Sequence, residues 1–223
     1  MAALASTSPE AERHYKATNG AIFSADKPGL LHLGYTDEGH LTTYYPDSPD
    51  ITQGEISAVS KWMESKGLLP ENTRLRKTKD GVYELLIASA ETSIPSNGGD
   101  IGKDTDFQVD DGALKGKTIR LVYGDYSAEM AQIAKNISLA VENADNETQA
   151  NMHREYAKSF AGGSLLAFKD SQRYWIRDKG PNVECNIGFI ETYRDPAGTR
   201  GEWEGFAASM APTKHFHTAE SSN

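Results

Sequence analysis

The chain has 223 residues, of which 38% are hydrophobic and 25% are charged, so it can form one large globular domain or two small ones. Its formal net charge is −9 and its pI is near 5.2. An acidic surface repels phosphate backbones and anionic lipids, which argues against nucleic-acid binding and membrane-surface binding. The same charge is compatible with a cationic ligand.

The sequence favours a soluble protein of a reducing compartment. No stretch approaches the roughly 20 apolar residues that span a bilayer. Residues 1–5 are apolar, but no basic residue precedes them, so we expect no signal peptide. Cys185 is the single cysteine, which excludes an internal disulfide and a cysteine zinc site. We therefore expect a cytoplasmic protein, and we expect a monomer.

The first third of the chain predicts two helices separated by a strand and turns. Residues 8–18 read as a short helix, and residues 33–46 have strand and turn composition. Thr52 and Glu55 have the spacing of a capping box, which opens a helix that ends at Gly67. One face of this helix is apolar at helical spacing, through Ile56, Val59, Trp62 and Met63.

The middle of the chain predicts short strands. Residues 73–90 read as a hairpin, with a turn at Asp80-Gly81. Residues 93–106 are rich in Gly, Ser, Asn and Asp and predict an exposed loop. Residues 117–123 alternate like a further strand.

Two helices are predicted after these strands. Ser127 can cap a helix that runs to about Asn143, and a second helix covers about 147–169, with a possible break at Gly162-Gly163. Helices and short strands without regular βαβ repeats indicate an α+β fold. Residues 207–223 lack periodicity and predict a disordered tail, so the folded domain is expected to cover residues 1–206.

A search for a catalytic nucleophile or a metal site in the sequence finds neither. Gly162-Gly163-Ser164 lacks a nucleophile-elbow pattern, and Cys185 follows Glu184, which raises rather than lowers a thiol pKa. No two histidines have the one-turn helical spacing with a Glu between them that hydrolytic zinc sites use. The six histidines are His14, His32, His40, His153, His215 and His217.

Residues 175–206 combine aromatic and acidic side chains in a way that suits a ligand-binding wall. The carboxylates here are Glu184, Glu191, Glu202 and Glu204. Glu191 and Tyr193 are two apart, so they share a face if the segment is extended, and Arg194 can brace one of the carboxylates. Carboxylates in a partly dry pocket bind an ammonium group through charge-assisted hydrogen bonds. The alternative is a surface network of ion pairs, with Trp175 and Trp203 as core or interface aromatics.

The same segment resembles the dipeptidyl peptidase III family of zinc exopeptidases. The resemblance is carried by Trp-Ile-Arg-Asp-Lys-Gly-Pro (175–181), Ile-Gly-Phe-Ile-Glu-Thr-Tyr-Arg-Asp-Pro (187–196) and Arg-Gly-Glu-Trp-Glu-Gly-Phe (200–206). Residues 33–45 and 72–75 also match, so the resemblance covers roughly 20–206.

What the resemblance implies is a fold, an activity and a set of roles. It implies the lower lobe of a two-lobed cytosolic peptidase, with an antiparallel β-barrel-like sheet and flanking helices. Members release dipeptides from the N-terminus of short peptides. By resemblance, Glu191 binds the substrate ammonium and Tyr193 bonds the peptide. Glu204 lies close by, Trp175 lines the cleft, and short peptides with a free N-terminus are the expected partners.

The chain also departs from the family pattern. The family's zinc motif, His-Glu-x-x-x-His with a later Glu ligand, does not occur in this sequence. We therefore expect no catalytic residue and no bound zinc in this chain, and an inactive, truncated fragment of a zinc peptidase, because nothing in it activates water. The alternatives are a non-catalytic peptide- or protein-binding module that uses the acidic and aromatic face, and a gene-model product without a stable fold.

Overall fold

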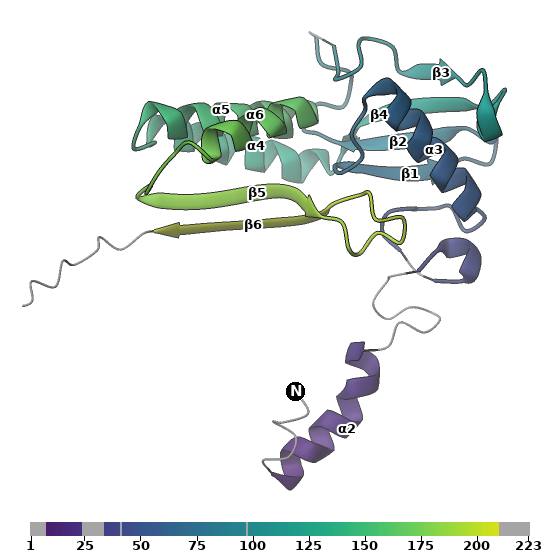
Figure 1. The fold of residues 1–223 in the computed structure, drawn as a ribbon, viewed down its shortest axis with the longest axis horizontal. Helices are drawn as coiled ribbons and strands as arrows, with labels where there is room; N and C mark the ends of the chain where they lie inside the picture. Colours follow the sequence, from purple (N-terminus) through teal and green to yellow (C-terminus); the bar gives the residue numbers. More distant parts are fainter. Residues whose placement is uncertain (1–7, 24–33, 41, 97, 210–223) are drawn as a thin grey trace, which may run out of the picture.

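The computed structural model describes residues 8–23, 34–40, 42–96 and 98–209. These residues form the helices α2 to α6 and two β-sheets (Figure 1). Helix α2 (Pro9–Phe23) begins within one residue of the predicted helix start and stands apart from the other elements in Figure 1. None of the helices in the described ranges is long and apolar enough to cross a membrane.

Helix α3 (Gln53–Lys66) confirms the capping-box prediction. Thr52 accepts a hydrogen bond from the backbone N–H of Glu55, and the Glu55 side chain accepts one from the backbone N–H of Thr52. Gly67 ends the helix in the left-handed conformation, with a φ of 70°. The predicted apolar face is buried and packs into the first core cluster, between α3 and the larger sheet.

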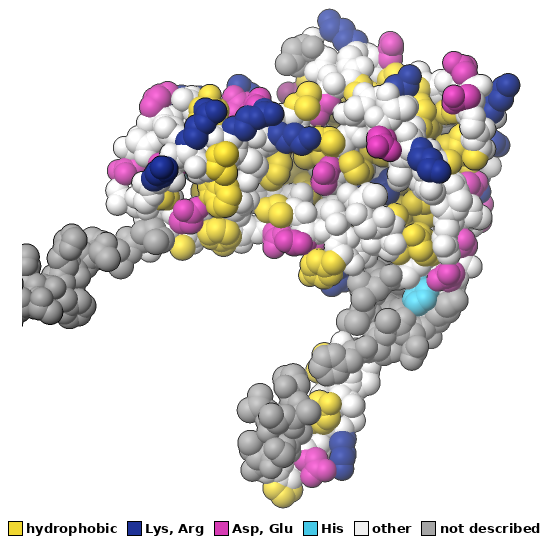
Figure 2. Space-filling view, viewed as in Figure 1, with side chains coloured by type: hydrophobic (Ala, Val, Ile, Leu, Met, Phe, Trp, Pro, Cys, Tyr) yellow, Lys and Arg dark blue, Asp and Glu magenta, His cyan; other side chains and the backbone are white. Residues whose placement is uncertain are grey.

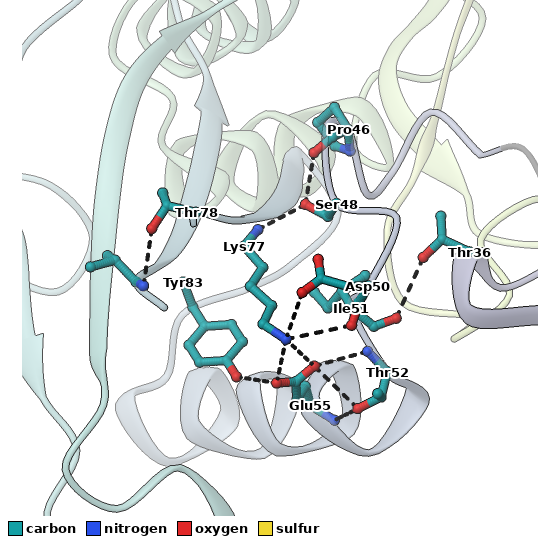
Figure 3. A network of polar contacts seen from close by, with 11 residues as sticks. Thr36, Pro46, Ser48, Asp50, Ile51, Thr52, Glu55, Lys77, Thr78 and Tyr83 are labelled. Atoms are coloured by element: carbon teal, nitrogen blue, oxygen red, sulfur yellow. Dashed lines mark hydrogen bonds and ion pairs between the residues drawn. The ribbon is translucent and has the colours of Figure 1, made fainter. Parts of the chain in front are cut away.

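The Glu55 carboxylate also fixes α3 to that sheet (Figure 3). The Tyr83 hydroxyl donates to Glu55 Oε1 over 2.6 Å, and Lys77 Nζ lies 3.0 Å from the same oxygen. Burial opposes ionisation, but the hydrogen bonds from Tyr83, Thr52 and Lys77 outweigh it and lower the pKa of Glu55 to about 2. One charged side chain therefore caps the helix and connects it to two strands.

The larger sheet is mixed, and its strand order is β1-β2-β4-β3. Strands β1 (Thr73–Lys77) and β2 (Tyr83–Ala88) form the predicted antiparallel hairpin. Strand β4 (Thr118–Asp125) pairs with β2 in parallel, and β3 (Asp106–Gln108) adds to β4 antiparallel. The α+β class is confirmed. The antiparallel, barrel-like sheet is not: the long connection between β2 and β4 permits parallel pairing, and this sheet has two edges in the described part.

The prediction of a strand between residues 33 and 46 was wrong. The described part of this segment holds a short 3₁₀ helix, η1 (Thr36–Glu38), followed by bends and turns. Gly39 turns the chain with a φ of 82°. The Tyr44 and Tyr45 side chains are both buried, whereas an extended segment would place them on opposite faces. Packing of both rings therefore excludes a regular strand here.

Three helices follow β4 and form a second core cluster against the smaller sheet. These are α4 (Ser127–Glu142), α5 (Glu147–Gly162) and α6 (Leu165–Trp175). The predicted break is confirmed, because Gly163 ends α5 with a φ of 74°. Ser127 was wrongly predicted as the cap of α4: the N-cap is Tyr126, which has a φ of 53° and makes no side-chain capping bond.

The smaller sheet is an antiparallel hairpin of β5 (Val183–Glu191) and β6 (Glu202–Ser209), which runs below α4, α5 and α6 in Figure 1. Strand β6 continues through residues 207–209, so the folded part extends three residues into the segment that we predicted as a disordered tail. Pairing with residues 183–185 of β5 provides the order that composition did not indicate. Residues 210–223 lie outside the described residues.

Candidate functional site

The β5–β6 hairpin carries the predicted carboxylates, and its register decides where they point. Phe189 pairs with Trp203, but the next pair is Glu191 with Glu202, so Ile190 is an extra residue in β5. A β-bulge of this kind shifts the side-chain alternation of its strand. Without the bulge, the Glu191 side chain would lie on the same face as that of Phe189, whose ring packs against the second core cluster.

The bulge therefore brings three carboxylates to one face of the hairpin. Glu191 is directly opposite Glu202, and Glu204 is two residues further along the same strand. Cross-strand partners share a face, as do residues two apart in a strand. Trp203 lies on the other face, with its ring 5.4 Å from the ring of Phe160 in α5 and 5.1 Å from that of Phe189.

Two of these carboxylates are open to solvent. Glu191 and Glu204 are exposed, and neither makes a hydrogen bond or ion pair within the described residues. Figure 2 shows acidic and hydrophobic side chains side by side along the edge of the molecule that the hairpin forms. An unpaired, hydrated carboxylate can exchange water for a cationic ligand without breaking a bond inside the protein.

The third carboxylate, Glu202, is held in place. The Tyr44 hydroxyl donates to Glu202 Oε2 over 2.5 Å, and Arg194 Nε lies 3.4 Å from the same oxygen. Burial raises the pKa of the Tyr44 hydroxyl, and the bond to Glu202 raises it further. Arg194 thus braces a carboxylate, as predicted, and the carboxylate is Glu202.

Tyr193 is 73% exposed and lies beyond the end of β5. The strand ends at Glu191, so the argument from strand alternation does not place Tyr193 on the face of Glu191. Tyr193 instead occupies the loop 192–200, which joins the two strands. Its position relative to Glu191 depends on the conformation of that loop.

Trp175 is half-buried at the last residue of α6. Its ring packs against the second core cluster, and its Nε1 donates to Glu184 Oε1 over 2.5 Å. Glu184 belongs to β5, so this bond connects the end of α6 to the hairpin. Cys185, the next residue, is buried, and burial raises the pKa of its thiol, which makes it a poor nucleophile.

The sequence profile of peptidase family M49 matches residues 14–220. The chain belongs to this family. The family profile continues past Phe206, where we placed the end of the resemblance. Dipeptidyl peptidase 3 of Dictyostelium discoideum is 47% identical over 189 residues, which are 85% of this chain and 25% of that protein. Dipeptidyl peptidase 3 of Homo sapiens is 37% identical over 204 residues, 90% of this chain and 27% of that protein.

This M49 chain thus spans about a quarter of the length of these curated relatives. Two solved structures are also similar, at a lower level. Dipeptidyl-peptidase III from Corallococcus sp. strain EGB has a TM-score of 0.48 at 20% identity and covers 78% of this chain and 25% of that one. DPP III from Caldithrix abyssi has a TM-score of 0.49 at 16% identity, with coverages of 90% and 35%.

Zinc, which the family resemblance implies, has no suitable ligands in the described part of this M49 chain. No group of three His, Cys, Asp or Glu side chains there is placed to hold a metal ion. His153 is buried in α5, where desolvation lowers its pKa, and its Nδ1 has no partner within the described ranges. His32, His215 and His217 lie outside those ranges. The described residues do not fit a structural or catalytic zinc site, and no step below passes through one.

A cavity of about 460 Å³ lies beside the hairpin, and no sequence pattern predicted it. It is lined by β1, the N-terminal part of α4 and the start of β6. Arg74 forms two hydrogen bonds with Asp125, of 2.7 and 2.6 Å, and its guanidinium lies 4.6 Å from the centre of the Tyr126 ring. Two of the charged side chains that line the cavity, Arg74 and Asp125, are thus paired with each other.

Asp195 is the main residue of this region that sequence reasoning missed. Its carboxylate is fully buried and accepts bonds from the Tyr45 hydroxyl and from backbone N–H groups of the loop 192–200. The signal was available in Asp195-Pro196 followed by Gly198, because Asp side chains bind backbone N–H groups in such turns. The partner Tyr45 is far away in sequence and could not be found from local pattern.

Proposed function

We propose that this chain supplies the amine-binding wall of an M49-type peptidase site, which holds the free N-terminus of a short peptide. Glu191 binds the ammonium group, Tyr193 hydrogen-bonds the peptide, and Glu204 adds negative charge on the same face of the hairpin. Trp175 borders the far end of the hairpin, beside Glu184. Arg194 holds Glu202 in place. The observation that carries this proposal is that Glu191 and Glu204 are exposed, unpaired among the described residues and on one face of the hairpin.

The chemistry of an ammonium group fits this face. A protonated amine is a compact cation with three donors, and two carboxylates on one face provide more acceptor positions than it needs. The Glu202 carboxylate is already paired with Arg194 and hydrogen-bonded by Tyr44, so in the proposal it does not bind the ammonium group. The net charge of −9 raises the local concentration of cationic peptides.

The proposal assigns peptide hydrolysis to the family and only peptide binding to this chain. The relatives carry the name dipeptidyl peptidase 3, and the chain covers about a quarter of their length. In the proposal, dipeptide release from peptides requires groups that the described residues do not contain, and this chain on its own anchors peptides without cleaving them. The side chains above bind and orient the peptide N-terminus.

Calorimetry with a tetrapeptide and its N-acetylated twin tests the proposal. The peptide with the free amine should bind the chain more tightly, and its advantage should shrink with added salt, because partly exposed charges are screened. Equal affinity for both peptides would contradict the amine-binding role and favour a module that recognises peptide or protein surfaces in another way. Absence of binding by either peptide would contradict both.

A further inference from the structure

The loop 192–200 connects the two strands of the candidate site and carries Tyr193 and Arg194. At its centre the Asp195 side chain has no exposed surface. Its carboxylate accepts three backbone hydrogen bonds from within the loop, from Ala197 at 3.1 Å, Thr199 at 3.0 Å and Arg200 at 2.9 Å. The Thr199 hydroxyl donates a fourth bond, also over 3.0 Å. One buried carboxylate thus sets the course of most of the loop.

The same loop is attached to the part of the fold around α3. The Tyr45 hydroxyl donates to Asp195 Oδ1 over 2.6 Å, and burial raises the pKa of this hydroxyl, which keeps it a donor. The Tyr35 hydroxyl donates to the carbonyl of Pro196 over 2.9 Å. At the end of the loop, the N–H of Gly201 donates to the carbonyl of Glu71 over 2.8 Å. These bonds fix the loop relative to the first core cluster.

Arg200 supplies the positive charge that balances Asp195. Its side chain is fully buried, Nη1 lies 3.9 Å from Asp195 Oδ2, and the guanidinium lies 5.3 Å from the centre of the Tyr45 ring. Nε and Nη2 have no hydrogen-bond partner among the described residues. A buried cation bonded this sparsely depends on its counter-charge, so loss of either partner leaves the other uncompensated.

We propose that Asp195 and Arg200 are positioning residues that set the distance between the Glu191 carboxylate and the Tyr193 hydroxyl. The inference rests on the proposed amine-binding function. Tyr193 is exposed, and its side chain makes no hydrogen bond or ring contact within the described residues, so its place follows from the backbone of its loop. A rigid loop presents both groups to the peptide without an ordering cost at binding.

The test compares Asp195→Asn with Glu55→Gln in the full chain. Asparagine keeps the shape of Asp195 but loses its charge and one acceptor oxygen. Glu55 is a matched control, because its carboxylate also binds a tyrosine hydroxyl over 2.6 Å and backbone amide, yet it lies on α3 rather than in the loop. The quantity measured is the ratio of Kd values for the N-acetylated and the free tetrapeptide, well below each melting temperature.

We expect Asp195→Asn to lose most of the preference for the free peptide, and Glu55→Gln to keep it. Tyr45→Phe removes a single bond to Asp195 without changing charge, and it serves if Asp195→Asn does not fold; it should lose part of the preference. Full preference in folded Asp195→Asn or Tyr45→Phe would overturn the positioning role and leave the proposed function standing. Equal loss in Glu55→Gln would overturn it as well, since the effect would follow stability alone. No preference in the wild-type chain would instead overturn the proposed function.

Discussion

At the scale of single residues, a few carboxylates with similar chemistry have different tasks because their surroundings differ. Glu55 and Asp195 are paired with tyrosine hydroxyls and backbone N–H groups and serve the fold. Glu191 and Glu204 are exposed and unpaired within the described part of the chain, and serve the proposed site. Sequence spacing singled out Glu191, and the family resemblance added Glu204. Neither could separate a binding carboxylate from a structural one, because the partners Tyr44 and Tyr45 lie far away in the chain.

Glu55 gives a pH-dependent contribution to stability. Its pKa is lowered to about 2 in the folded chain, below the value of a free glutamate. A lowered folded-state pKa contributes stability above the unfolded-state pKa, and this contribution is lost as pH falls through the folded-state value. Wild-type chain should therefore lose stability between about pH 5 and pH 2 more steeply than Glu55→Gln, as measured by urea midpoints across this range.

Glu64→Gln is the control for this experiment, because Glu64 is exposed on the same helix and makes no side-chain bond within the described residues. Its pH profile should follow the wild type. If the stability of Glu55→Gln fell as steeply with pH as that of the wild type, the hydrogen bonds of Figure 3 would not be the cause of a lowered Glu55 pKa.

At the scale of elements, local pattern was sufficient where the signal lies within a few residues. The capping box of α3, the β1–β2 hairpin and the break between α5 and α6 were all predicted. Local pattern did not predict the features that depend on contacts between distant segments. These are the parallel pairing of β2 with β4, the irregular course of residues 42–46, and the bulge at Ile190. That bulge matters most, since it moves Glu191 to the face of the other two carboxylates.

The corner between α5 and α6 makes a prediction of its own. Gly163 has a φ of 74°, and a Cβ there would lie 2.6 Å from Cγ2 of the buried Ile87. Gly67 has nearly the same φ, 70°, with no atom within 4 Å of such a Cβ. Gly67→Ala should lower the free energy of unfolding by about 1 kcal/mol through backbone strain alone. Gly163→Ala should lower it by about 1–3 kcal/mol more through overpacking.

Urea denaturation of the two variants measures this difference directly, with the slopes compared to confirm that the unfolded states match. Equal losses in both variants would contradict the close approach of α5 to β2.

At the scale of the whole molecule, the described residues of the M49 chain form two core clusters, one between α3 and the larger sheet and one between α4 to α6 and the smaller sheet. The β5–β6 hairpin is connected to both. The second cluster and α6 hold strand β5 of the hairpin, and Tyr35, Tyr45 and Glu71 hold its loop. The α+β class followed from pattern alone. The arrangement of the strands in two separate sheets could not be predicted from pattern, because strand pairing depends on contacts between distant segments.

The central claim is that the Glu191 carboxylate binds the ammonium group of a peptide. A thermodynamic cycle tests it most directly: the affinities of the free and N-acetylated tetrapeptide are measured for wild type, Glu191→Gln and the control Glu142→Gln. Glu142 is exposed at the C-terminal end of α4, whose N-terminal part lines the cavity beside Glu202, so this control makes the same charge change at the opposite end of the helix from the proposed site.

Hydrogen bonds to charged groups contribute about 1.5–3 kcal/mol, so Glu191→Gln should weaken binding of the free peptide by roughly 10- to 100-fold. It should leave the acetylated peptide unchanged, and Glu142→Gln should change neither peptide by a comparable factor. Equal weakening of both peptides by Glu191→Gln, or no weakening of either, would contradict the claim.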